Sequence, residues 1–314
     1  MNIRTSVEIS LDQILVLLDE KSINTAHRDR YVEFLESGQY RREFTWVAED
    51  GDGRVAAVAI WWTFPSADRP FALDGLFAAP AVTDPVPLWT ELVQQVVRDA
   101  PADEEPPSYH IFLPPGWRED AEIQAALQPR LAAAAGAGMT EILERLRFEW
   151  LAEMSVPARS QRLTFRTEPD DEAYLDVFRR VAAGSLDAST RDAIARAGLD
   201  GYACEDLGMY KTMPGERGWW KLAYDKSGDL VGFAIPSRNN GGPVVGFLGV
   251  VPEHRGHGFA DDLLAEITAD LADLGAQRIA ADTDATNVPM ANSFRRLGYR
   301  EFAIRLVVSP PQAA

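Results

Sequence analysis

The chain has 314 residues and a formal net charge of −17 at pH 7, and 46% of its residues are hydrophobic. The length suits two domains of ordinary size, and the composition is that of a soluble globular protein. Nucleic acids and anionic membranes are poor partners for so acidic a chain, because both bind clusters of Lys and Arg. No apolar run approaches the roughly 20 residues that span a bilayer. The single cysteine, Cys204, allows no intrachain disulfide, so we expect a cytoplasmic protein.

Segments in the two halves of the chain resemble each other in one order. The first pair reads as a strand, a glycine-containing turn and a second strand, and the next pair as a strand that ends in proline. In the third pair the later segment reads as a short helix that ends at Gly298, and we expect the earlier segment to form the same helix. The matching segments are 45–60 with 220–235, 71–80 with 243–252, and 139–148 with 290–299.

This repeat predicts two domains, residues 1–154 and 162–314, joined by a linker at 155–161. The first half has extra residues around its proline-rich segment 101–107, which indicates an insertion loop.

The most informative segment joins a β-branched strand at 243–251 to a helix that begins at Phe259. Gly256 and Gly258 lie between them, directly before the helix. The first backbone N–H groups of a helix lack intrahelical acceptors, and the peptide dipoles leave a partial positive charge there. Such a turn can therefore bind an anion without a lysine, and the missing side chains let phosphate groups approach closely.

The corresponding turn of the first copy has different chemistry. Aligned without a gap, Thr83 stands in place of Arg255 and Asp84 in place of Gly256. Pro85 and its neighbour Pro87 remove two backbone donors, and the Asp84 carboxylate puts a negative charge where a phosphate would bind. We expect the first copy to bind no such ligand.

Read as a pattern, the turn is Val-x-Pro followed by Arg-x-x-Gly-x-Ala, ending at Ala260. It resembles the acetyl-CoA signature of the GNAT family of N-acetyltransferases. A strand at 279–284 and a helix from Asn287 to a Gly-Tyr pair at 298–299 are similar to the closing segment of that family. The chain is thus identified as a tandem GNAT protein with a degenerate first copy. The resemblance implies an α/β (α+β) fold, in which each domain has a mixed, mostly antiparallel sheet flanked by helices.

The resemblance also implies acetyl-CoA as co-substrate and no metal. Pantetheine would add to the edge of strand 244–251, and a backbone N–H near Val250 or Val251 would stabilise the oxyanion of the reaction. The pair His254 and His257 flanks the turn, so we expect cofactor contact there and no zinc. The cofactor-binding residues expected are Leu248, Val250, Val251, Arg255, Gly256, His257, Gly258, Phe259, Ala260, Asn287, Asn292 and Phe294.

The implied reaction is direct attack of a small-molecule primary amine on the thioester. Phe294 stands where the family often has a tyrosine that protonates the leaving thiolate, and the nearby replacements are Asn292, Ser293 and Tyr299. The strand before the turn contains no glutamate that could act as base, so the nearest carboxylates are Asp282 and Asp284. Alternation along a strand places both on one face. If that face is the cleft either can act as base, and if it is solvent neither has a role.

In the family the first two helices shape the acceptor pocket. Here that region, 182–213, is either an acidic and aromatic pocket for an amine or a set of solvated helix faces; its polar residues are Asp187, Tyr202, Glu205, Asp206 and Tyr210. The missing tyrosine and glutamate leave a second hypothesis open, a non-catalytic protein that binds and senses acyl-CoA. Because two joined copies can replace a dimer of single domains, we expect a monomer.

Overall fold

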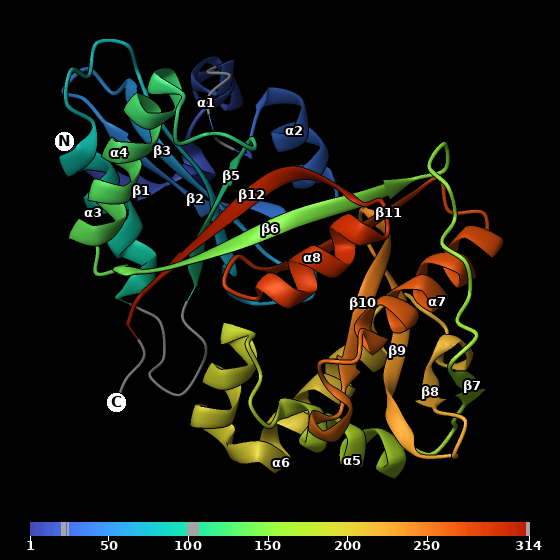
Figure 1. Ribbon diagram of the computed structural model, residues 1–314. Helices are drawn as coiled ribbons and strands as arrows, with labels where there is room; N and C mark the ends of the chain where they lie inside the picture. Colours follow the sequence, from blue (N-terminus) through green and yellow to red (C-terminus); the bar gives the residue numbers. More distant parts are fainter. Residues whose placement is uncertain (20–22, 24, 99–106, 312–314) are drawn as a thin grey trace. The chain divides into compact units, whose positions relative to one another are not determined.

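The computed structural model in Figure 1 describes residues 1–19, 23, 25–98 and 107–311. The chain divides into two compact units, Met1–Glu144 with Ile304–Ala314, and Arg145–Ala303. The predicted insertion loop at 101–107 lies, apart from Pro107, outside the described residues.

The first unit has the strand order β1-β2-β3-β4-β5-β12. Neighbouring strands are antiparallel except for β4 and β5, which are parallel. The strands are β1 (Asn2–Thr5), β2 (Tyr40–Glu49), β3 (Val55–Trp62), β4 (Ala72–Ala78), β5 (Ser108–Leu113) and β12 (Arg300–Ser309). The helices are η1 (Ser6–Glu8), α1 (Leu11–Leu15), η2 (Val16–Asp19), α2 (Arg28–Glu36), α3 (Val86–Val97) and α4 (Ala121–Gly136).

The second unit repeats this arrangement with the order β6-β11-β10-β9-β8-β7, in which β10 and β11 form the parallel pair. Its strands are β6 (Glu141–Leu151), β7 (Thr164–Thr167), β8 (Lys221–Tyr224), β9 (Leu230–Asn239), β10 (Gly242–Val250) and β11 (Arg278–Asp284). Its helices are α5 (Asp171–Ala182), α6 (Ala188–Thr212), η3 (Arg217–Trp219), η4 (Pro252–His254), α7 (Phe259–Asp273) and α8 (Val288–Arg296). The predicted mixed, mostly antiparallel sheet flanked by helices is confirmed.

The first unit completes its sheet with β12, from the far end of the sequence, and the second unit with β6, the strand at its own start. Residues 145–151 of β6 pair with β11, and residues 304–308 of β12 pair with β5. The units therefore differ from the predicted domains, 1–154 and 162–314, at both ends. The expected helix at 139–148 is wrong, because most of it belongs to β6. The pairing of that segment with a strand more than a hundred residues away decides its structure, and local similarity does not reveal such pairing.

Helices cover both faces of the sheet in the second unit. Phe233 and Ile235 of β9 pack with residues of α5 and α6, whereas Ala234 between them packs with residues of α7 and α8. This is the alternation expected of a strand that is buried on both faces. The α5 helix starts at an aspartate cap, since the side chain of Asp170 accepts the N–H of Glu172 at 3.0 Å.

The parallel strands β10 and β11 share a single register pair, Val244 with Ala280. Beyond it β10 stays paired with β9 as far as Val250 opposite Gly232. A register shift between Val245 and Phe247 places Gly246 in a bulge. The two parallel strands consequently diverge toward their carboxyl ends, and the edge of β10 opens on the side of β11.

We predict that Gly232→Ala weakens this arrangement. A Cβ at Gly232 would lie 2.0 Å from the carbonyl oxygen of Gly249 on β10, so the two backbones must separate. We expect a loss of about 1–3 kcal/mol in the free energy of unfolding, measured by denaturant titration.

The matched control is Gly208→Ala in α6, where no atom lies within 4 Å of the added Cβ. It should leave stability unchanged or raise it by about 0.5–1 kcal/mol. Equal effects of the two substitutions would show that the close approach of β9 and β10 has no special role.

Candidate functional site

The glycine turn predicted from the sequence opens directly from the end of β10. Gly256 and Gly258 have φ angles of +79° and +75°, in the left-handed region, and Gly258 is the N-cap of α7. No atom lies within 4 Å of a Cβ placed on Gly256. The turn thus presents exposed backbone at the positive end of a helix of 15 residues.

Arg255 contributes to this turn through its side chain. Its guanidinium donates to the carbonyl oxygens of Val250 (3.1 Å), Val181 (2.7 Å) and Ala183 (2.8 Å). These bonds satisfy carbonyls at the C-terminal end of α5 and hold them against the end of β10. The predicted cofactor residue Arg255 therefore shapes the turn, and its charged group is already engaged with the protein backbone.

A second arginine supports the turn from the other side. Arg162 donates to the carbonyl oxygen of His257 (2.9 Å), forms an ion pair with Asp262 and lies over the Phe259 ring at 4.6 Å. His254 and His257 also contact that ring, with centroid distances of 6.0 and 6.2 Å. The expected residues Phe259 and Ala260 are half-buried, and His257 is exposed.

The structure separates the two backbone N–H groups expected near the oxyanion, those of Val250 and Val251. The N–H of Val251 donates to the carbonyl oxygen of Val231 at 2.9 Å, so it is not available to an oxyanion. Successive N–H groups of a strand point to opposite edges. The N–H of Val250 therefore points away from β9, toward the side on which β11 diverges, as does that of Leu248 two residues before.

The residues expected from α8 are divided between core and surface. Phe294 is 2% exposed and stacks on Phe148 with a centroid distance of 4.9 Å, so it packs in the core instead of lining an open surface. Asn287 caps α8 by accepting the N–H of Met290 (3.4 Å), and Asn292 is exposed. The predicted contact of Phe294 with a cofactor thus has no support from its position.

The two other replacements for the missing tyrosine are engaged in the core. The Ser293 hydroxyl donates to Asp261 (2.5 Å), and the Tyr299 hydroxyl lies 2.7 Å from that of Thr268. Burial raises the pKa of Tyr299, which makes it a poor proton donor. Neither side chain is free to reach a leaving thiolate.

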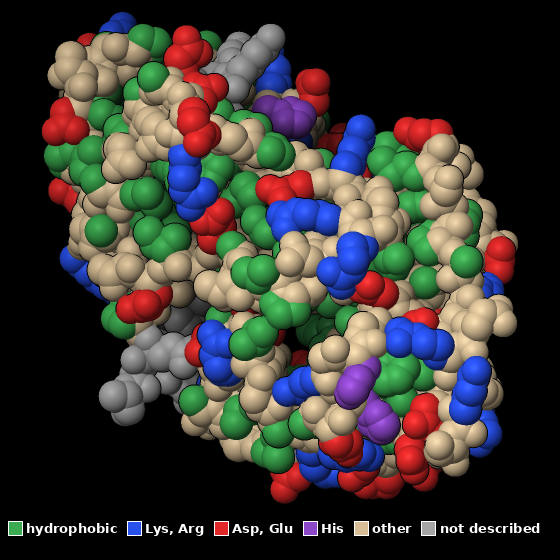
Figure 2. Space-filling model, in the orientation of Figure 1, with side chains coloured by type: hydrophobic (Ala, Val, Ile, Leu, Met, Phe, Trp, Pro, Cys, Tyr) green, Lys and Arg blue, Asp and Glu red, His purple; other side chains and the backbone are tan. Residues whose placement is uncertain are grey.

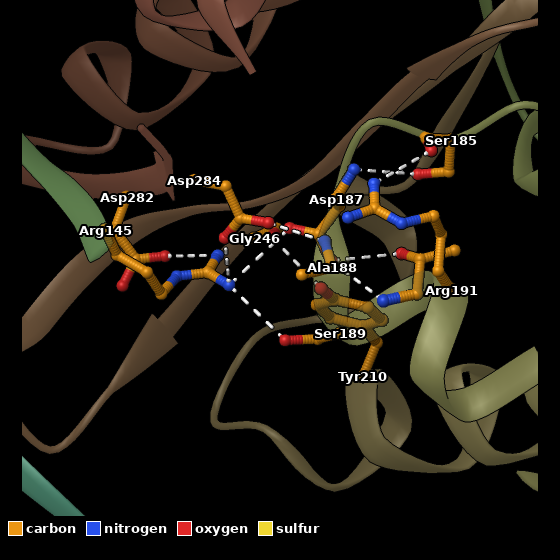
Figure 3. Close-up of polar contacts among 11 residues, drawn as sticks. Arg145, Ser185, Asp187, Ala188, Ser189, Arg191, Tyr210, Gly246, Asp282 and Asp284 are labelled. Atoms are coloured by element: carbon orange, nitrogen blue, oxygen red, sulfur yellow. Dashed lines mark hydrogen bonds and ion pairs between the residues drawn. The ribbon is translucent and has the colours of Figure 1, made fainter. Parts of the chain in front are cut away.

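Asp282 and Asp284 share one face of β11, as alternation predicts, and both contact Arg145 (Figure 3). The distances from the guanidinium are 3.0 Å to Asp282 and 2.9 Å to Asp284. Asp284 is fully buried and also accepts the N–H of Ala188 at 2.5 Å. Burial raises the pKa of Asp284, while the Ala188 N–H and the Arg145 charge oppose that rise. Arg145 therefore occupies the face that these two carboxylates share, on which Asp284 is buried and Asp282 is partly exposed.

Asp206 on α6 has the electrostatics of a general base. Burial raises its pKa to about 6, and the charges of Asp187 and Glu205 act in the same direction. Nearby on this helix, the Tyr210 hydroxyl donates to the carbonyl oxygen of Gly246 at the bulge of β10 (3.2 Å). Tyr202 is 2% exposed, and its hydroxyl interacts with the Asp206 carboxyl and opposes the rise of that pKa.

These positions favour the acidic and aromatic pocket over solvated helix faces. Tyr202, Asp206 and Tyr210 follow each other at a spacing of four residues, which places them along one side of a helix. That spacing could have singled out Asp206 from the sequence. Figure 2 shows the surface hollowed between α8 and the helices α5 and α6, with hydrophobic side chains inside.

The first unit has the same parallel pair, but its own side chains occupy the corresponding places. The Asp84 carboxylate accepts the N–H of Val86 (3.2 Å) at the start of α3, where an anion would bind. Arg130 is 2% exposed and donates to the carbonyl oxygen of Leu76 on β4 (3.0 Å). The indole N–H of Trp89 donates to the next carbonyl, that of Phe77 (2.8 Å).

Solved structures of the same fold cover almost the whole chain. A GCN5-related N-acetyltransferase from Sphaerobacter thermophilus aligns with a TM-score of 0.58 and 17% identity, over 98% of this chain and 94% of its own. A tandem GNAT protein from the clavulanic acid biosynthesis pathway aligns with a TM-score of 0.50 and 17% identity, over 99% of both chains. At 17% sequence identity, these structural alignments show that the chain shares the fold and nothing more.

Sequence comparisons are more specific, and the family match falls in the second unit. The sequence model of the Acetyltransferase (GNAT) family matches residues 190–299. Mycothiol acetyltransferases from Pseudarthrobacter chlorophenolicus and Arthrobacter sp. (strain FB24) are each 32% identical over 95 residues, which is 28% of this chain and 29% of the relative's length. Residues 190–299 are thus similar to the GNAT family, and the part of the chain that matches the mycothiol acetyltransferases spans less than a third of those relatives.

None of the helices in the described ranges is long and apolar enough to cross a membrane. Those ranges also contain no group of three His, Cys, Asp or Glu side chains placed to hold a metal ion.

We predict that Asp206→Asn raises stability at neutral pH. The folded-state pKa of Asp206 is about 6, above its ordinary 3.8, so the ionised carboxylate destabilises the folded state. That cost is full above about pH 6 and absent below about pH 4. The melting temperature of the variant should exceed that of the wild type at pH 7, and the difference should disappear as the pH falls. A difference independent of pH would contradict the raised pKa of this partly buried carboxylate.

Proposed function

We propose that the second unit binds acetyl-CoA and transfers the acetyl group to the primary amine of a small molecule. One observation carries the proposal: the diverging edge of β10 continues without interruption into the exposed glycine turn at the start of α7. An extended chain with an anionic end fits this combination, because pantetheine can pair with a strand edge and a pyrophosphate with a helix N-terminus.

In this proposal the amine attacks the thioester carbonyl at the open edge of β10. The N–H of Val250 is placed to stabilise the developing oxyanion. The acceptor must lose a proton, and Asp206, with a pKa of about 6, is mostly ionised at neutral pH and able to accept it directly or through water. We propose Asp206 as the base in preference to Asp282 and Asp284, because Arg145 pairs with both of those carboxylates.

The departing thiolate needs no dedicated acid in this scheme. Phe294 is buried, and the hydroxyls of Ser293 and Tyr299 are engaged elsewhere. A thiol has an ordinary pKa of about 8.5, so its thiolate is a good leaving group near neutral pH.

We further propose a single cofactor site per chain. In the first unit Asp84 occupies the helix N-terminus, and Arg130 takes the Leu76 carbonyl of β4, which points away from β3 and on which a pantetheine would depend. The first unit would then serve as a structural partner of the second.

The cofactor part is tested by calorimetric titration of acetyl-CoA into the wild type, Gly258→Asp and Gly258→Asn. Asp and Asn have nearly the same shape, and both tolerate a positive φ better than most residues. Only Asp puts a negative charge beside the pyrophosphate. We expect one site in the wild type, a loss of at least about tenfold in affinity for Asp relative to Asn, and a smaller loss for Asn.

Two sites per chain would contradict the proposal for the first unit. No binding to the wild type would reject the cofactor, and equal losses for Asp and Asn would mean that the pyrophosphate lies elsewhere.

The buried Phe294 favours one second candidate, a protein that binds acyl-CoA without turning it over. Thiol release from acetyl-CoA separates the two functions when it is followed with a panel that contains a monoamine, a diamine and an aminosugar. We expect at least one amine to stimulate release and Asp206→Asn to lower kcat/KM by roughly 10²–10⁴-fold, the range for loss of a general base. Tight binding of acetyl-CoA with no stimulated release by any amine would favour the sensor.

A further inference from the structure

The geometry points to Arg145 as a positioning residue of the acyl-transfer site, one that fixes the first turn of α6 against β11 and thereby sets the acceptor-binding surface. The inference rests on the proposed function, because it assigns α6 to the acceptor. Arg145 lies outside the motifs that identify the site in the sequence, which are at 250–260 and 287–299.

Arg145 reaches this position through strand pairing. It lies on β6 directly opposite Asp284 of β11, and directly opposite side chains of an antiparallel pair point to the same face. Asp282 is the diagonal neighbour on that face. The guanidinium meets both carboxylates, at 2.9 and 3.0 Å, with its side chain only 14% exposed.

The same guanidinium contacts the start of α6. It lies 3.5 Å from the Asp187 carboxylate and 3.5 Å from the Ser189 hydroxyl (Figure 3). Asp187 is the N-cap of α6 and accepts the N–H of Thr190 at 2.9 Å. The N–H of Ala188 is in turn donated to Asp284. Two strands and one helix N-terminus are thus joined through one positive charge.

The C-terminal half of α6 also lies close to this cluster and to β10. Gly198, with a φ of +71°, kinks the helix between its two halves. Beyond the kink, the charge of Asp187 raises the pKa of Asp206, and Tyr210 is anchored on the bulge of β10. The first turn of α6 and the proposed base therefore lie within electrostatic range of each other.

Removing the arginine would leave a strongly unbalanced cluster. Asp187, Asp282 and Asp284 face Arg145, and Asp206 and Tyr210 lie behind them on α6. Burial lowers the pKa of Arg145, but the charges of Asp282, Asp187 and Asp284 outweigh it and raise that pKa, so the guanidinium stays charged. Without it the carboxylates repel one another, α6 loses its fixed start, and the pKa of Asp206 rises because its surroundings become more negative.

The test compares Arg145→Met with Arg278→Met in the full chain. Arg278 is a matched control, because it pairs with the buried Glu149 across the same two strands, at the other end of β11 and away from α6. For each variant we would measure acetyl-CoA affinity, acceptor KM and kcat, the pH profile of kcat/KM, and hydrogen exchange of the amides at 188–192.

For Arg145→Met we expect acetyl-CoA affinity within about twofold of the wild type and an acceptor KM raised by roughly 10-fold to 100-fold, the effect of a misplaced binding surface. The acidic limb of the pH profile should move to higher pH, and exchange at 188–192 should become faster. Arg278→Met should change none of these four quantities.

A buried carboxylate left without its partner can prevent folding, so Arg145→Met/Asp284→Asn is the second variant. Its neutral Asn keeps the bond from the Ala188 N–H, and we expect it to fold and to bring the acidic limb back toward the wild type. Its acceptor KM should stay raised, because Asp187 and Ser189 are still not held.

The inference is overturned if acceptor KM and exchange at 188–192 are unchanged in both Arg145 variants, or if Arg278→Met alters them equally. A wild-type protein with no acyl transfer would instead reject the proposed function. In that event the exchange measurement still decides whether Arg145 fixes α6.

Discussion

The close contact of β9 with the end of β10 is the constraint on which the rest of the structure depends. Gly232 leaves room for the Gly249 carbonyl, so β10 follows β9 along its whole length and cannot also follow β11. A parallel pair that meets at one position has a free strand edge on each side of the divergence. The glycine turn, the bulge at Gly246 and the kinked helix α6 are all arranged around that edge.

The divergence of β10 and β11 also determines how charged side chains are paired in the second unit. A gap between strands exposes polar backbone and buries side chains that face it, so every ionised group there needs a partner. Arg145 supplies one for the carboxylates of β11, and Arg255 supplies donors for the carbonyls that end α5. Asp206 remains with two negative neighbours and a raised pKa, which is the condition for proton transfer near neutral pH.

Local features of the site were predictable because consecutive residues determine them. The turn at Gly256 and Gly258 needs only positive φ angles and a following helix, and the shared face of Asp282 and Asp284 needs only strand alternation. The errors arose from long-range pairing. The partner of the Val251 N–H lies on β9, the ring that covers Phe294 lies on β6, and Arg145 precedes its partner Asp282 by 137 residues. No pattern within a short window contains that information.

The late position of β12 in the sequence has a consequence for biosynthesis. The sheet of the first unit is completed by residues 304–308, which leave the ribosome after the entire second unit. During translation one edge of β5 therefore stays unpaired until β12 is made. The first unit cannot complete its fold before the second unit is synthesised, unlike the usual order in which the N-terminal domain folds first. The second unit can close its own sheet first, since β6 is already synthesised. The later half of the gene product is then expected to reach its native state before the earlier half.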